Sequence, residues 1–350
     1  MRRIILISMT FAFLLFSCRQ EQQSDSVIKL IIDTDFGANA GDIDDMGALT
    51  IAHSLMNNNE CKIVAVVLSI NNGYAIKAAD AVNTYFGRGD IPIAVTDKEL
   101  VYQDSSFAYY ITNNFPSDII PEKSPKATDF YRELLSKMPD NSINLAIIGY
   151  PINIFNLFKS SPDKFSNLNG IDLVAKKIKC FYIMGGEFPK GQDVSNFRMA
   201  GDCVAKYVIE NSPRPIVFND INIGMMKNGF KTGHQINSMP DSSIVKQTFA
   251  YWFRNVPWWY TLAGASLPPK DSISDHHLWD EITVHTAVRG TGDWFKLDSV
   301  GSCEVSCGGF TTWNPSIDKP QSFLKIKMDP QKFSDEYMLP LMMAKPINRK

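Results

Sequence analysis

The stretch between Leu30 and Cys61 contains no lysine and no arginine, although the whole chain has 35 basic and 37 acidic residues. It nevertheless holds five aspartates within thirteen positions, from Asp33 to Asp45. Their mutual repulsion must be relieved by protonation, by solvent, by basic residues from elsewhere in the chain, or by a bound cation. A hard divalent cation is the best single explanation.

Cysteine is also scarce, with six residues in the chain. Cys303 and Cys307 are the only close pair. They could bridge in an exported protein, but no second Cys or His pair at the spacing of a zinc site accompanies them. Cys61 and Cys180 lead into apolar runs, which is typical of cysteines that act as small buried hydrophobic residues. We therefore predict no disulfide framework and leave open whether Cys303 pairs with Cys307.

The chain has no large excess of charge of either sign, and a formal net charge of −2 gives it no general attraction for nucleic acid. The apolar run from Ile4 to Phe16 is shorter than the roughly 20 residues that a membrane-spanning helix needs. Because it follows two arginines and ends near Cys18, it has the order of a secretory signal. Residues 15–18 resemble the end of a bacterial lipoprotein signal. That resemblance implies an exported protein anchored through a lipid on Cys18 at the periplasmic or cell-surface face of a bacterial membrane, whereas an ordinary cleaved signal would leave Cys18 incidental.

The remaining sequence shows no linker, repeat or low-complexity break. We predict a signal peptide at residues 1–18, a tether at 19–26 and one domain at 27–346. Apolar runs rich in β-branched residues alternate with segments of helical spacing. The predicted strands are residues 27–32, 61–68, 91–95, 143–148, 178–184 and 215–218, and the predicted helices are 46–56, 75–86, 152–158, 202–210 and 282–289. Strands separated by helices predict a single α/β domain with an open, mostly parallel sheet and helices on both faces.

Polar side chains follow the first two predicted strands directly. Asp33 and Asp35 end the first strand, and Asn71 and Asn72 come after the second. Open α/β sheets bind their ligands at the carboxyl ends of the strands, so these positions are candidates for metal or substrate binding. The alternative is that the acidic residues are solvated in a loop, and that one of those at 44 and 45 caps the following helix.

The string Asp33-Thr-Asp-Phe-Gly, followed by Asp42-Ile-Asp-Asp-Met-Gly-Ala-Leu, resembles the aspartate signature of the inosine/uridine-preferring nucleoside hydrolases. It matches the variant of that signature in which an extra aspartate, here Asp42, precedes the paired aspartates 44 and 45. Residues 38–41 make a longer insertion than usual, so the role of Asp42 stays open. Residues 83–93, 149–154, 178–197 and 278–290 are also similar to that family.

The resemblance implies a calcium-dependent enzyme that hydrolyses the N-glycosidic bond of ribonucleosides or related N-ribosides. Its substrate would be a small molecule, and the enzyme could be a homo-oligomer. Carried over by position, Asp35 is the catalytic base and a metal ligand, Asp45, Asp280 and the backbone carbonyl of Ile152 complete the Ca²⁺ site, and Asp44 and Asn196 bind ribose.

Two positions depart from the family pattern. Val194 stands where a glutamate is usual, and Trp279 stands where many members have the histidine that protonates the leaving base. His276 and His277 either substitute for that acid or are solvated loop residues. We expect Trp279 and the two consecutive tryptophans Trp258 and Trp259 to contact the leaving group. The aromatic side chains between positions 248 and 260 suit helix packing or an oligomer interface equally well.

Two other functions fit parts of the sequence. Asp33 and Asp35 after a first strand also suit a phosphatase of the haloacid dehalogenase type, in which they would supply a nucleophile and an acid near Mg²⁺. The paired aspartates come too soon after the strand for that class. A lipid-anchored protein that binds a sugar or nucleoside through Ca²⁺ without cleaving it is the non-enzymatic alternative.

Overall fold

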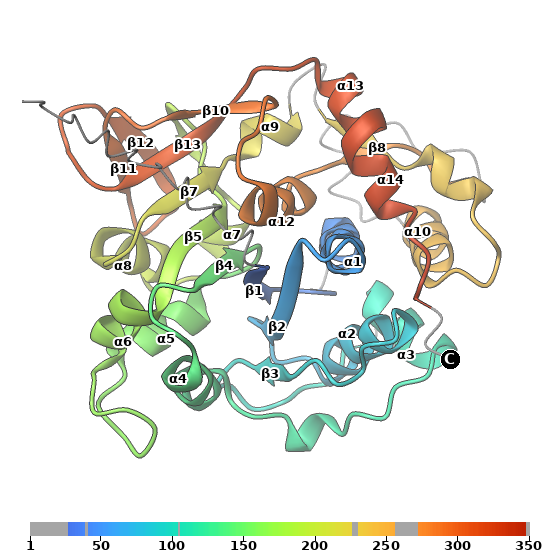
Figure 1. Cartoon of the computed structure of the whole chain (residues 1–350), viewed down its shortest axis with the longest axis horizontal. Helices are drawn as coiled ribbons and strands as arrows, with labels where there is room; N and C mark the ends of the chain where they lie inside the picture. Colours follow the sequence, from blue (N-terminus) through green and yellow to red (C-terminus); the bar gives the residue numbers. More distant parts are fainter. Residues whose placement is uncertain (1–26, 39–40, 104–105, 226–229, 256–271, 348–350) are drawn as a thin grey trace, which may run out of the picture.

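The structure is a computed structural model, and it describes residues 27–38, 41–103, 106–225, 230–255 and 272–347. An eight-stranded sheet lies at its centre (Figure 1) in the order β10-β13-β7-β5-β4-β1-β2-β3. All neighbouring strands in it are parallel except β10 and β13, which are antiparallel. The strands are β1 Ile28–Thr34, β2 Cys61–Leu68, β3 Ile93–Val95, β4 Ile143–Ile147, β5 Ile178–Met184, β7 Ile216–Asn219, β10 Phe295–Asp298 and β13 Gln321–Ile326.

Helices cover both faces of this sheet (Figure 1), so the predicted single α/β domain is confirmed. The helices of eight or more residues are α1 Asp44–Asn57, α2 Gly73–Tyr85, α3 Phe107–Asn114, α4 Ala127–Lys137, α5 Ile152–Lys159, α6 Gly170–Lys177, α8 Val204–Asn211, α10 Ile244–Arg254 and α12 Asp280–Arg289. Shorter helical segments are Pro121–Lys123, α7 Asn196–Met199, α9 Ile221–Met225, His234–Ser238, α13 Pro330–Phe333, Ser334–Met338 and α14 Leu339–Met342.

The two helical layers bury two separate apolar cores. Side chains alternate along β1, so Leu30 and Ile32 pack with α1, α2 and α12, while Ile31 packs with α4, α5 and α8 on the other face. All three side chains are at most 1% exposed. Burial on both faces explains why three apolar residues, Leu30, Ile31 and Ile32, follow one another in β1.

The carboxyl ends of four central strands are in register. Asp33 of β1 is paired with Ile147 of β4, Ile147 with Ile183 of β5, and Ile183 with Phe218 of β7. The residues that follow these four positions therefore leave the sheet side by side, along one edge.

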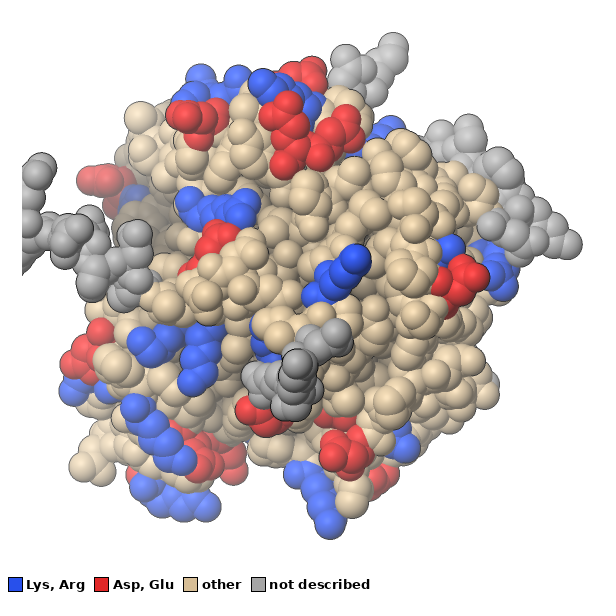
Figure 2. All heavy atoms as spheres, turned by 45° about the vertical axis from the view of Figure 1, so that its right-hand side comes forward, with Lys and Arg blue, Asp and Glu red and all other residues tan. Residues whose placement is uncertain are grey.

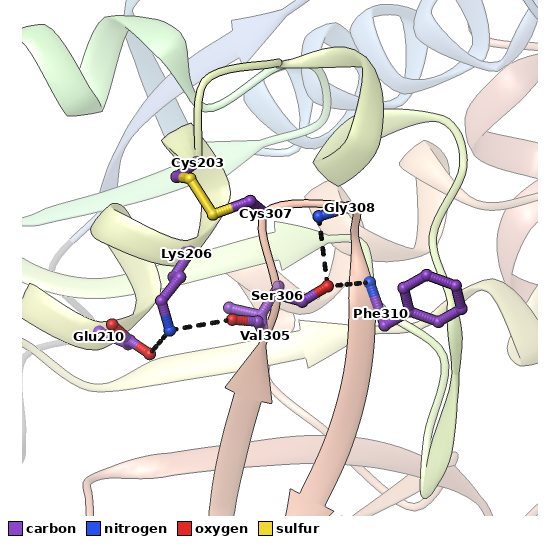
Figure 3. The surroundings of a disulfide bond; sticks show 8 residues. All are labelled: Cys203, Lys206, Glu210, Val305, Ser306, Cys307, Gly308 and Phe310. Atoms are coloured by element: carbon purple, nitrogen blue, oxygen red, sulfur yellow. Dashed lines mark hydrogen bonds and ion pairs between the residues drawn. A yellow bond between two sulfur atoms is a disulfide. The ribbon is translucent and has the colours of Figure 1, made fainter.

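A small antiparallel sheet, absent from the sequence prediction, consists of β11 Ser302–Val305, β12 Phe310–Asn314 and β6 Lys190–Gln192. A disulfide between Cys203 and Cys307 joins the turn between β11 and β12 to the start of α8 (Figure 3). This single bond was not predicted, and the possible Cys303–Cys307 pair does not form, because Cys307 is bonded to Cys203 and Cys303 is a free, buried cysteine of β11. The partners are 104 residues apart, so only the tertiary fold brings them together.

The last strand pair is β8 Lys231–Thr232 with β9 His276–His277.

Lys and Arg side chains are interspersed with Asp and Glu on the face shown in Figure 2. Among the described helices, none combines the length and apolar character needed to cross a membrane. Cys18 with its leader, and the pair Trp258 and Trp259, lie outside the described residues.

Candidate active site

Asp33 at the end of β1 is completely buried and supports the edge of the sheet. Its carboxylate accepts a hydrogen bond of 2.6 Å from the Tyr131 hydroxyl of α4, and bonds of 3.1 and 3.2 Å from the Asn153 amide of α5. Burial raises the pKa of Asp33 to about 7. Because neutral partners hold it from two helices, Asp33 fixes the turn that carries Asp35.

Asp35 lies against the turn that follows β4. A Cβ at position 149 would overlap the backbone nitrogen of Asp35 and lie 2.9 Å from its carboxylate, so only glycine lets the two turns approach. The Tyr150 hydroxyl donates a hydrogen bond to the Asp35 carboxylate, and burial raises the pKa of Asp35 to about 7. Ile152 begins α5 three residues after Gly149.

Two helix starts meet the same edge. Asp44 and Asp45 begin α1, Asp280 begins α12, and the two helices pack against each other. Carboxylate oxygens of these three residues lie within 4.8 Å of one another, and the side chains are only 7, 4 and 3% exposed. The Asp45 carboxylate also accepts a hydrogen bond from the Thr34 hydroxyl. The cap residue of α1 is Ile43, with no side-chain cap, so the alternative in which Asp44 or Asp45 caps this helix is wrong.

The electrostatics of this cluster favour a cation. Burial and repulsion from neighbouring carboxylates, including Asp35, raise the pKa values of Asp44, Asp45 and Asp280 well above their usual range. Within the described residues, no lysine or arginine forms an ion pair with them. Buried, convergent carboxylate oxygens without a counter-charge are the donors that Ca²⁺ and Mg²⁺ bind. The residues present therefore fit a hard divalent cation.

A second, less obvious group lies behind the three aspartates. Glu281 is completely buried, and its carboxylate lies 3.2 Å from Nε2 of His276, which is completely buried as well. Nδ1 of His276 lies 3.0 Å from the Thr232 carbonyl. A Cβ at Gly47 of α1 would overlap the Glu281 carboxylate, so that glycine makes room for it. Glu281 was not among the predicted site residues, because nothing in the sequence pattern marks it as buried. The alternative of two solvated loop histidines is wrong, because His276 is buried and both histidines belong to β9.

The aromatic residue before Asp280 is largely enclosed. Trp279 is 8% exposed, and its indole nitrogen donates a 3.0 Å hydrogen bond to the Ile221 carbonyl. Its ring packs against Gly224 and lies 4.9 Å from the His277 ring. Trp279 therefore forms part of the wall between α9 and α12, next to the aspartate cluster.

Asn196 lies at the same edge of the sheet, at the start of α7. Its amide nitrogen is 3.2 Å from the Met184 carbonyl at the end of β5. Met184 is paired with Asn219 of β7, whose amide donates a 2.5 Å hydrogen bond to the Trp279 carbonyl. A chain of contacts through Met184 and Asn219 thus connects Asn196 to Trp279, the residue before Asp280.

Asn71 and Asn72 are engaged with a neighbouring loop. The Asn71 amide donates to the Glu99 carbonyl, and the Asn72 amide donates to the Gln103 carbonyl at 3.0 Å. The Asn72 carbonyl oxygen caps α2 by accepting from the Tyr74 nitrogen. Both side chains thus have hydrogen-bond partners within the protein itself.

Comparisons with solved structures find the same architecture in nucleoside hydrolases. Over 91% of the chain, the structure matches a plant nucleoside hydrolase with a TM-score of 0.66 and 18% identity, covering 99% of that chain. A purine-preferring ribonucleoside hydrolase from Gardnerella vaginalis matches with a TM-score of 0.64 and 14% identity, over 90% of this chain and 98% of that one. An inosine-uridine preferring nucleoside hydrolase from Bacillus anthracis matches with a TM-score of 0.58 and 15% identity, over 91% of this chain and 99% of that one.

At the level of sequence, no family model and no curated protein matches the chain. The structural matches show that it has the fold of the nucleoside hydrolases, over nearly their whole length.

Proposed function

We propose that this protein hydrolyses the N-glycosidic bond of ribonucleosides or related N-ribosides with the help of bound Ca²⁺. One observation carries the proposal: Asp44, Asp45 and Asp280 converge, buried, with Asp35 beside them, at the carboxyl edge of a sheet with the nucleoside hydrolase fold. Two segments far apart in the sequence supply these groups, residues 35–45 and Asp280, so chance placement in one acidic loop does not account for them.

The residues that would hold the ion are Asp35, Asp45, Asp280 and the carbonyl of Ile152. When bound, a divalent cation lowers the pKa of water and orients vicinal hydroxyl groups. Asp35 is the group that accepts the proton from the attacking water. Tyr150 orients the carboxylate of Asp35 through its hydroxyl.

Substrate contacts follow from the remaining polar groups. Asp44 and Asn196 bind the ribose hydroxyls, and the carboxylates around the sugar stabilise the positive charge that develops on the ring as the bond breaks. Asn71 and Asn72 remain candidates that would have to exchange their present partners for substrate.

The leaving group faces a site without the usual acid. Position 279 carries an indole, and His276 is held between Thr232 and Glu281. We therefore propose that Trp279, together with Trp258 and Trp259, lines an apolar pocket, and that turnover depends strongly on the acidity of the leaving group itself.

The disulfide bears on location. Disulfides persist in oxidising compartments, so the Cys203–Cys307 bond supports the proposal of an exported protein. Its substrate would then be met outside the cytoplasm. The lipid anchor at Cys18 is proposed from the sequence of the leader alone.

A substrate panel separates the proposed activity from its alternatives. The purified protein is incubated in Ca²⁺ with inosine, uridine, adenosine, p-nitrophenyl riboside and p-nitrophenyl phosphate. Release of ribose or nitrophenol from the ribosides alone supports the proposal. Release from the phosphate alone would establish the phosphatase, which the structural matches do not support. Calorimetric binding of nucleosides without release of product would establish the binding protein.

A further inference from the structure

Asp193 organises the turn that carries Asn196. Its side chain is 1% exposed, and one carboxylate oxygen accepts hydrogen bonds of 2.9 Å from the backbone nitrogens of both Ser195 and Asn196. The Ser195 hydroxyl, 3.1 Å away, donates to the same oxygen. The other oxygen accepts a 2.8 Å bond from the nitrogen of Gly186, directly after β5. One carboxylate therefore ties the turn to the end of the strand.

The backbone of Asp193 is held as well. Its nitrogen donates to the Gly309 carbonyl at 2.9 Å, and its carbonyl accepts from the Arg198 nitrogen at 3.2 Å. Gly309 belongs to the turn between β11 and β12, which the Cys203–Cys307 disulfide fastens to α8 (Figure 3). The turn that holds the backbone of Asp193 is thus itself linked covalently to α8.

This arrangement fixes Asn196 but leaves its side-chain oxygen available to a ligand. Its backbone nitrogen is bound by Asp193, and its side-chain nitrogen points to Met184. Within the described residues, its side-chain oxygen has no hydrogen-bond partner. An oriented amide oxygen beside a sugar site is suited to accept a hydrogen bond from a hydroxyl group.

We propose that Asp193 is a positioning residue: it sets the Asn196 amide in the orientation that binds the sugar. This inference rests on the proposed function, because it needs the sugar to occupy the site next to Asn196. Four donors converge on the Asp193 carboxylate, which is an acceptor only, whereas an asparagine there would turn an amide N–H toward at least one of those donors.

The test is a double-mutant cycle on the full-length protein with p-nitrophenyl riboside as the substrate. Asn196→Ala should raise KM roughly ten-fold, the effect of losing one hydrogen bond to the substrate, with kcat changed much less. Asp193→Ala should raise KM by a similar factor. If Asp193 acts through Asn196, the double variant should have the KM of Asn196→Ala alone, because two residues that act as one unit are not additive.

Asp163 provides a matched control. It closes a turn of the same kind far from the site, accepting from the nitrogens of Phe165 and Ser166 at 2.9 and 3.0 Å. Asp163→Ala should lower the melting temperature, since it also removes a salt bridge to Arg132, and should leave KM unchanged.

Two results would overturn the inference. One is an unchanged KM for Asp193→Ala while the wild type turns over, and the other is a double variant whose KM increase is the product of the two single increases. If the proposed function itself is wrong, the wild-type protein will release no nitrophenol from p-nitrophenyl riboside, so the two failures are distinguishable.

Discussion

Removing one carboxylate from the aspartate cluster should have opposite effects on the calcium-free and the calcium-bound protein. Oxygens of Asp44, Asp45 and Asp280 lie within 4.8 Å of one another. Two unit charges at that distance repel by about 3.5 kcal/mol at an effective dielectric constant near 20. The realised repulsion is smaller, because raised pKa values let the group share protons near neutral pH. We therefore expect Asp280→Asn to stabilise the calcium-free protein by about 1 to 3 kcal/mol.

The same substitution removes a ligand, so calcium should no longer stabilise the variant as it does the wild type. Urea unfolding at pH 8.5, in EDTA and in Ca²⁺, measures both effects, and Asp45→Asn should behave in the same way. Asp241→Asn serves as an isosteric control, because its side chain is 98% exposed. A calcium-free Asp280→Asn protein that is less stable than the wild type, yet keeps the wild-type calcium affinity, would refute the reasoning.

Three further predictions concern pH, the disulfide and the anchor. In EDTA the melting temperature should fall between pH 5 and 8. Buried carboxyl groups such as Asp33, with a pKa of about 7, hold protons more tightly in the folded state than in the unfolded state. The stability that they contribute is therefore complete below about pH 4 and is lost as the pH rises through 7. The increase in melting temperature caused by Ca²⁺ should grow over the same range, and a pH-independent increase would contradict this. Replacing Cys203 and Cys307 by serine should lower the free energy of unfolding by about 2 to 4 kcal/mol, measured without reductant, because the bond closes a loop of 104 residues; equal sensitivity of wild type and variant to dithiothreitol would count against it. Cys18→Ala should move the protein from the membrane fraction to the soluble fraction on ultracentrifugation, and unchanged fractionation would exclude the lipid anchor.

The central strands were predictable because their signals are local. Residues 61–68 and 178–184 form β2 and β5 with the predicted bounds, since each is a largely apolar run bounded by polar residues or glycine. The observed ends of the predicted helices differ from the predicted ends by one or two residues. For example, α8 begins at Val204 instead of residue 202, because Asp202 and Cys203 adopt left-handed backbone angles before it. The antiparallel sheet of β6, β11 and β12 was missed, because its strands are short and come from distant parts of the chain.

The candidate site was predictable to the extent that a motif or a strand end marked it. Asp35, Asp44 and Asp45 follow β1 in one acidic stretch, and Asp280 was found only through the family resemblance. Glu281 carries no such signal, since a glutamate in the first turn of a helix is usually solvent-exposed and favoured by the dipole. Only the packing of α12 against Gly47 of α1 shows that it is buried. The same holds for Asp193, whose four hydrogen bonds depend on the fold of a turn.

Calcium-dependent riboside cleavage is the central claim, and one titration tests it most directly. The protein is first freed of metal with EDTA and dialysed, and the initial rate of nitrophenol release from p-nitrophenyl riboside is then followed as Ca²⁺ is added back. We predict no release above background without metal, and a rate that rises with Ca²⁺ and saturates when the aspartate site is filled. Full activity in EDTA, or no activity at saturating Ca²⁺, would contradict the account.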